Sequence, residues 1–145
     1  MRYSIIAMLI SALPLTGCMR PPATLDLSLD KPTTQDKYIV AIHPQAADIV
    51  INHLHAWEVR VTSPSGEPVL HAHIDVDGGM PQHGHGLPTK PRVTQELGDG
   101  RYLLEGMKFS MTGWWVIKLR IETDQNGTDA VTFNKVIEIP RREKV

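Results

Sequence analysis

The side chains best suited to metal chemistry lie in one short stretch, residues 77–88, whose sequence is DGGMPQHGHGLP. It contains the thioether of Met80 and the imidazoles of His83 and His85. Thioether and imidazole ligands together favour Cu(I). Four glycines in this stretch allow sharp turns, and two prolines stiffen the backbone. The residue types therefore predict a stiff loop that can hold a soft metal.

The same stretch also fits a purely structural loop. In that interpretation His83 and His85 form hydrogen bonds with the backbone, and Met80 is a hydrophobic plug in the core. Residue types alone leave both interpretations open.

Two further histidine pairs have the same spacing, His53 with His55 and His71 with His73. Residues two apart on a strand share a face at about 6–7 Å, which suits two ligands of one metal but is common. His71 and His73 alternate with apolar residues, so we expect them to face solvent. His53 and His55 precede Trp57 on one strand face, so we expect both at the edge of the core.

Methionine recurs beside a pair of tryptophans in the segment EGMKFSMTGWW, residues 105–115. Met107 continues the apolar pattern of a predicted strand and is expected in the core. Met111 lies near a strand end before Gly113, where a loop can place it beside another loop. Trp114 and Trp115 point to opposite faces, so one is expected in the core while the other is free to cover a site.

The N-terminus predicts export and lipidation. Arg2 precedes an apolar run over residues 5–15, which is typical of a signal peptide and shorter than the about 20 residues of a membrane span. The run ends in LTGC, which resembles the bacterial lipobox, so we expect cleavage before Cys18 and a lipid on that cysteine. The alternative is a plain N-terminal anchor helix. Met19, instead of aspartate, favours the periplasmic side of the outer membrane.

Composition narrows the classes of function. The mature chain would have 128 residues, enough for one domain, and its 14 basic and 16 acidic residues give a formal charge of −2. This balance offers no basic stripe for nucleic acid, which we exclude as a partner. Cys18 is the only cysteine. Once it is lipidated, no thiol remains, so soft-metal ligands must come from methionine and histidine.

Alternating apolar and polar residues predict an all-β domain without a convincing amphipathic helix. Seven to eight short strands in about 100 residues favour an immunoglobulin-like β-sandwich, with a small barrel as the alternative. The expected strands cover residues 38–42, 53–62, 69–76, 92–97, 101–107, 115–122 and 130–139, with a possible short strand at 25–30.

These assignments divide the chain into three segments. Residues 1–17 form the signal peptide, residues 18–36 the lipidated N-terminus and tether, and residues 37–140 the β-sandwich. Burial is expected for Trp57 and Trp115. On the strand at 69–76, one face is expected to carry Leu70, Ala72, Ile74 and Val76.

Several of these segments together resemble the YtkA-like and FixH-like periplasmic domains. The resemblance rests on HAW at residues 55–57 and on VDGGMPQHGHGLPTKPRVTQELGDGRYLLEGMKFSMTGWW at residues 76–115. These segments match an M-P-x-[HM]-x-H-G loop, a G-x-G-x-Y hairpin and an F-x-M-x-G-x-W strand, and the similarity extends over residues 38–123. The resemblance implies an exported immunoglobulin-like sandwich in a group linked to copper handling and respiratory oxidase assembly. It implies a metal site formed by Met80, His83, His85 and Met111, with His55 as outer ligand or support.

The chain departs from the family pattern in two respects. Gln82 stands where many relatives have a second methionine, and a lipid anchor replaces the membrane helix usual in FixH-like proteins. No G-x-S-x-G, H-E-x-x-H, P-loop or dinucleotide motif occurs, so we expect no enzyme. We expect instead a lipid-anchored periplasmic protein that binds Cu(I) for handling or delivery. The alternative is a structural or partner-binding module of the cell envelope that uses the glycine- and histidine-rich loop.

The lipidation hypothesis predicts that Cys18→Ser releases the protein from the membrane fraction, because serine cannot form the thioether that carries the lipid. Fractionation of cells that express the wild type and the variant measures this. A Cys18→Ser protein that stays in the membrane fraction contradicts lipidation at Cys18.

Overall fold

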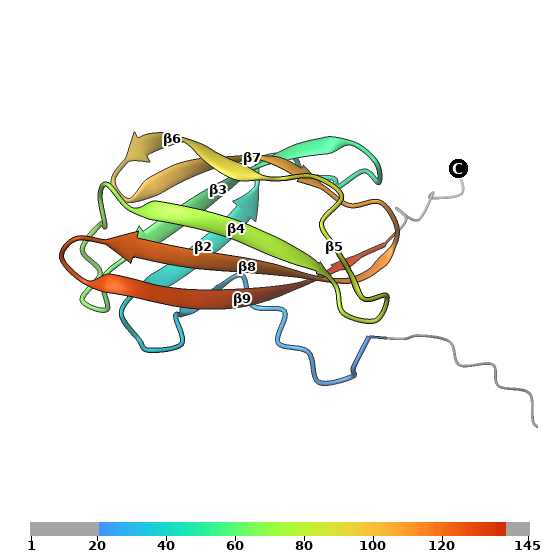
Figure 1. Ribbon diagram of the computed structural model, residues 1–145, viewed down its shortest axis with the longest axis horizontal. Helices are drawn as coiled ribbons and strands as arrows, with labels where there is room; N and C mark the ends of the chain where they lie inside the picture. Colours follow the sequence, from blue (N-terminus) through green and yellow to red (C-terminus); the bar gives the residue numbers. More distant parts are fainter. Residues whose placement is uncertain (1–20, 139–145) are drawn as a thin grey trace, which may run out of the picture.

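Two antiparallel β-sheets pack face to face in the computed structural model, which describes residues 21–138 (Figure 1). The described residues contain nine strands and no helix. The five-stranded sheet has the order β1 (Asp30–Pro32), β2 (Ile39–Pro44), β3 (Leu54–Thr62), β7 (Arg101–Lys108) and β6 (Arg92–Gly98). The four-stranded sheet has the order β5 (His85–Gly86), β4 (His73–Met80), β8 (Gly113–Thr123) and β9 (Gly127–Ile137). The prediction of an all-β sandwich is therefore confirmed.

The folded region begins earlier than residue 37. β1 lies within the stretch assigned to the tether, and it pairs with β2 through Asp30 opposite Ala41. The possible strand at residues 25–30 is not formed, apart from Asp30 itself. Cys18 and the signal peptide lie outside the described residues, as does the end of the last predicted strand. Within residues 21–138, no helix is long and apolar enough to cross a membrane.

The prediction for residues 69–76 is wrong in its first half. β4 begins only at His73, and Leu70 is 48% exposed instead of sharing an inward face with Ile74. The cause is a break at His71, whose φ of 54° lies in the left-handed region that interrupts an extended strand. The inward residue before the break is Val69, which is 7% exposed.

Alternation predicted the core well elsewhere. Trp57 and Trp115 are both fully buried, and Met107 is buried as expected. Trp57 faces the core from the five-stranded sheet, and Trp115 faces it from the four-stranded sheet. His71 and His73 are exposed at the surface, as predicted.

The crossing from one sheet to the other is fixed by Tyr102 of β7. Its hydroxyl donates to the carbonyl of Val69 at 2.7 Å and accepts from the N–H of Ala72 at 3.1 Å. Burial raises the pKa of this hydroxyl above its ordinary value, so it stays protonated and able to donate. These two hydrogen bonds fix the path of the chain from Val69 to the start of β4.

A second set of hydrogen bonds joins the β1–β2 loop to β9 through Asp129, which is 3% exposed. Its carboxylate accepts from the N–H groups of Gln35 at 2.9 Å, Lys37 at 3.3 Å and Ala130 at 2.8 Å. Burial alone would raise the pKa of Asp129, but the hydrogen bonds, these three among them, outweigh it and lower that pKa. The ionised carboxylate therefore stabilises this end of the sandwich.

Asp129→Asn is expected to lower the free energy of unfolding at neutral pH by about 2 kcal/mol, the scale of losing hydrogen bonds to a charged group. Because the folded-state pKa is lowered, the contribution of Asp129 is present above the unfolded-state pKa and is lost as pH falls through the folded-state pKa. Urea unfolding at several pH values measures both effects. The matched control is Asp124→Asn in the exposed β8–β9 turn, and an equal loss in both variants contradicts the role of Asp129.

Candidate functional site

The residues of the predicted metal site lie toward one end of the sandwich. The C-terminal end of β4, the short strand β5 and the start of β8 meet there (Figure 1). The start of β3 and the end of β7 lie at the same end, where Leu54 is opposite Lys108. Ring contacts join the two sheets, because Phe109 lies 5.4 Å from Trp115 between ring centroids.

The glycine- and histidine-rich loop is a tight turn between β4 and β5. The carbonyl of Met80 accepts from the N–H groups of His83 at 3.1 Å and Gly84 at 3.0 Å, and Met80 pairs with His85 across the hairpin. A side chain at Gly79, whose φ is 157°, would collide with the carbonyl oxygen of His85. Glycine at this position therefore allows β5 to lie directly against β4.

The two imidazoles of this turn are exposed and stacked. The rings of His83 and His85 lie 5.8 Å apart between centroids, at an interplanar angle of 26°. The Nδ1 of His85 lies 3.2 Å from the carbonyl oxygen of Gly86, so Nδ1 carries the proton of the neutral ring in that hydrogen bond. The Nε2 lone pair of His85 then remains available to a ligand, and no hydrogen bond within residues 21–138 engages the ring of His83.

Met111 is linked to the histidine turn through Trp115. The indole N–H of Trp115 donates to the carbonyl of Met111 at 3.1 Å. The same indole contacts the ring of His85 edge-on, at 5.8 Å between centroids. Met111 is 40% exposed, at the end where the histidines lie.

Met80 occupies a different environment from Met111. It is 1% exposed and belongs to the hydrophobic core, which is where the structural interpretation of the loop places it. Room for its methyl group is left by Gly113 at the start of β8, because a Cβ there would lie 2.9 Å from Met80 Cε. The backbone of Met80 therefore forms the turn, while its thioether packs inside the sandwich.

His55 lies at the start of β3, where it pairs with Met107 of β7. It is 8% exposed, and its Nε2–H donates to the carbonyl of Val50 at 2.8 Å. The loop before β3 is tied to the end of β7 by the N–H of Asn52, which donates to Phe109 at 2.8 Å. His53 is exposed, so the expectation of a core-edge position for it is wrong; it lies in the loop just before β3 begins.

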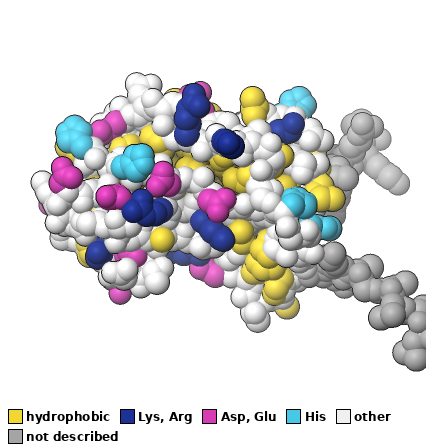
Figure 2. All heavy atoms as spheres, in the orientation of Figure 1, with side chains coloured by type: hydrophobic (Ala, Val, Ile, Leu, Met, Phe, Trp, Pro, Cys, Tyr) yellow, Lys and Arg dark blue, Asp and Glu magenta, His cyan; other side chains and the backbone are white. Residues whose placement is uncertain are grey.

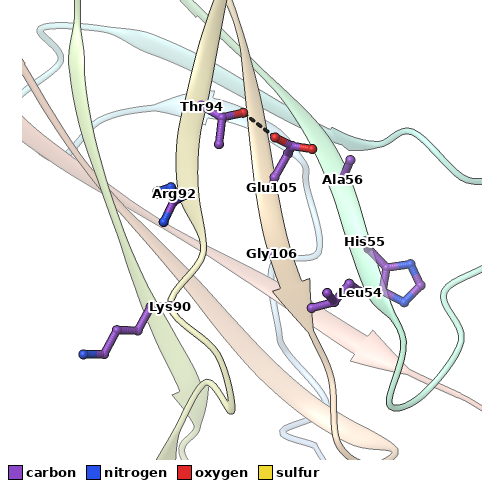
Figure 3. Close-up of a pocket in the computed structure, with 8 residues that line it drawn as sticks. All are labelled: Leu54, His55, Ala56, Lys90, Arg92, Thr94, Glu105 and Gly106. Carbon is purple, nitrogen blue, oxygen red and sulfur yellow. Dashed lines mark hydrogen bonds between the residues drawn. The ribbon is translucent and has the colours of Figure 1, made fainter.

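An open groove of about 430 Å³ adjoins this end on the outer face of the five-stranded sheet (Figure 3). Its walls include Leu54, Lys90 and Arg92, and the hydroxyl of Thr94 donates to Glu105 at 2.6 Å across it. The ring of His55 points away from these side chains. Sequence reasoning did not identify the groove, because it is formed by strands that are distant in the chain.

The surface differs between the two ends of the molecule (Figure 2). Histidine side chains lie toward both ends of the visible face; those at the end with β5 lie beside hydrophobic side chains, whereas those at the other end lie among charged ones. The charged face includes Arg120 of β8, which pairs with Asp75 at 3.1 Å and Glu122 at 2.8 Å. His73 lies beside this network, 3.1 Å from Asp75. In the described part of the chain, no three histidine, cysteine, aspartate or glutamate side chains form a group that could hold a metal.

Comparisons with known proteins agree with the architecture. The structure is similar to that of a DUF4426 family protein from Pseudomonas aeruginosa PAO1, with a TM-score of 0.52 and 19% sequence identity. The similarity covers 70% of this chain and 90% of that one, and at this identity it shows the fold alone. No curated protein matches the sequence. The sequence model of the YtkA-like family matches residues 33–120, more than half of the chain, and the matched region contains the turn, Met111 and Trp115. The chain therefore belongs to the YtkA-like family.

Proposed function

We propose that this YtkA-like domain binds Cu(I) at the β5 end of the sandwich and acts in copper handling or delivery, without catalysis. The observation that supports this most directly is the connection between donor groups from two separate loops. His83 and His85 stack on the β4–β5 turn, and Trp115 joins that turn to the backbone of Met111. Residues that carry imidazole and thioether groups therefore come from two connected loops at one exposed end.

The donor chemistry fits a soft ion better than a hard one. His83 and His85 would supply nitrogen, and Met111, which is 40% exposed, would supply sulfur. The thioether of Met80 is buried in the core, so it would reach a metal only from the inner side of the same turn. Two thioethers with imidazoles favour Cu(I) over Zn(II) or Ca²⁺. His55 would act as an outer ligand or through the loop it holds at Val50. Copper bound at these residues would be carried without a reaction on the protein.

The proposal includes a place in the cell. Lipidation of Cys18 would hold the domain on the periplasmic side of the envelope, on the outer membrane if Met19 directs sorting. The folded region begins near β1, so a short segment would separate the lipid from the sandwich. The domain would then sample copper close to the membrane surface, within reach of envelope proteins.

His83→Ala and Met111→Leu are each expected to weaken Cu(I) binding by about tenfold or more, because each removes one ligand. Met80→Leu tests the buried sulfur separately, since leucine keeps the packing volume. Anaerobic titration against a Cu(I) chelator measures the affinities. His71→Ala is the matched control, because His71 is exposed and is paired with Glu96 at 3.2 Å. Equal affinities for wild type, His83→Ala, Met111→Leu and His71→Ala contradict the proposed site.

Acidification provides an independent check on the nitrogen donors. Protons compete with metal for imidazole but not for thioether sulfur, so Cu(I) affinity is expected to fall as pH is lowered from about 7 to about 5. The His83→Ala variant should show a shallower pH dependence than the wild type. A wild-type affinity that does not change over this range indicates that imidazoles are not ligands.

A second function is favoured by one observation at the same end. Val50, Leu54 and Met111 are 46%, 68% and 40% exposed, and they form three of the five large exposed hydrophobic residues in the described region. Apolar side chains of this kind mark contact surfaces for other proteins. If the domain binds no Cu(I), a partner-binding module of the cell envelope becomes the better explanation of this end.

A further inference from the structure

We infer that Trp115 is a positioning residue for the proposed metal site, because it holds the Met111 segment in place beside the histidine turn. The inference rests on the proposed function for its role in metal binding. It can also be tested on protein without metal, because the hydrogen bond and the ring contact that carry it involve protein groups alone. The sequence predicted that Trp115 is buried, which leaves the other tryptophan of the Trp114–Trp115 pair free to cover a site. In the structure Trp115 is buried in the core and also contacts His85 of the histidine turn.

Trp115 can act as a fixed support because it does not move independently of the core. Its side chain is fully buried, and its ring packs edge-on against Phe109 with centroids 5.4 Å apart at an angle of 76°. Phe109 in turn packs against Trp57 at 6.4 Å. These ring contacts connect Trp115 of β8 with Trp57 of β3, so both sheets fix the position of the indole.

The indole connects the two loops that carry the proposed ligands. Its N–H donates to the carbonyl of Met111, and its ring edge contacts His85. Residues 109–112 join β7 to β8, and the indole hydrogen bond holds Met111 within that connection. Loss of that bond would leave the exposed thioether of Met111 free to sample more conformations. Metal binding would then have to restrict those conformations, which lowers affinity.

Trp115→Phe is the informative substitution, because phenylalanine keeps an aromatic ring in the core but has no indole N–H. Trp114→Phe is its matched control. Trp114 is half-buried, and its indole N–H also makes one hydrogen bond, to Asn134 at 3.0 Å. Both variants therefore lose one indole hydrogen bond, but only Trp115→Phe loses the bond to Met111.

Cu(I) competition on five proteins, the wild type, three single variants and one double variant, tests whether Trp115 acts through Met111. Trp115→Phe is expected to weaken binding by about tenfold, the scale for residues that orient a ligand, and Trp114→Phe by less than about twofold. In a Met111→Leu background, Trp115→Phe should cause less than about threefold further loss, because the residue it positions is already absent. Additive losses in the double variant overturn the inference while leaving the copper site intact. No Cu(I) binding by the wild type overturns the proposed function instead.

Two measurements on protein without metal test whether Trp115 positions Met111, whatever the result of the Cu(I) competition. In methyl-labelled protein, the Met111 methyl resonance should shift and sharpen in Trp115→Phe but not in Trp114→Phe, because its segment becomes mobile. In the wild type, the indole N–H of Trp115 should exchange with solvent at least tenfold more slowly than that of Trp114. The second measurement needs no variant, so it stands even if Trp115→Phe does not fold. An unchanged Met111 resonance, or rapid exchange at Trp115, contradicts the inference.

Discussion

The structure depends most on the aromatic contacts that join its two sheets, from Trp57 through Phe109 to Trp115. All three side chains are fully buried, and both contacts are edge-on, at 6.4 Å and 5.4 Å between centroids. Such pairs contribute about 0.5–1.5 kcal/mol each beyond the burial of the rings. Within residues 21–138, the indole N–H of Trp57 is buried and has no hydrogen-bond partner, and a buried donor left unpaired costs about 1–3 kcal/mol. Packing of the large rings outweighs this cost, because a buried aromatic residue removes about 150–250 Å² from water.

This aromatic cluster gives the β5 end a rigid base and leaves its outer layer exposed. The opposite end is stabilised by hydrogen bonds. The carboxylate of Asp129 accepts from backbone N–H groups of the β1–β2 loop, and the hydroxyl of Tyr38 donates to the carbonyl of Gly127 at 2.6 Å. At the β5 end, His83, His85 and Met111 stand outside the core on short turns. Donor groups on a stiff base lose little conformational freedom when they bind a ligand, which favours affinity. The two ends therefore differ in chemistry.

Sequence patterns predicted the buried residues of strands that alternate regularly between apolar and polar positions. They failed where the backbone conformation or the burial of a residue depends on parts of the chain that are distant in sequence. Trp57 and Trp115 were predicted as buried because their strands alternate over many positions. The left-handed backbone at His71 has no signal in its residue type, so the exposed Leu70 was missed. The burial of Met80 depends on the space that Gly113 leaves on a strand more than thirty positions away. The candidate ligands His83, His85 and Met111 could be named from the sequence, but the hydrogen bond from the indole of Trp115 to the carbonyl of Met111 follows only from the fold.

The central claim, a soft-metal site of mixed sulfur and nitrogen donors, is tested most directly by X-ray absorption at the copper edge on Cu(I)-loaded protein. A first shell with both sulfur and imidazole nitrogen scatterers is expected, and Met111→Leu should remove sulfur from that shell while His83→Ala removes nitrogen. A shell of nitrogen and oxygen alone, or one that neither substitution changes, would contradict a site built from the histidine turn and Met111.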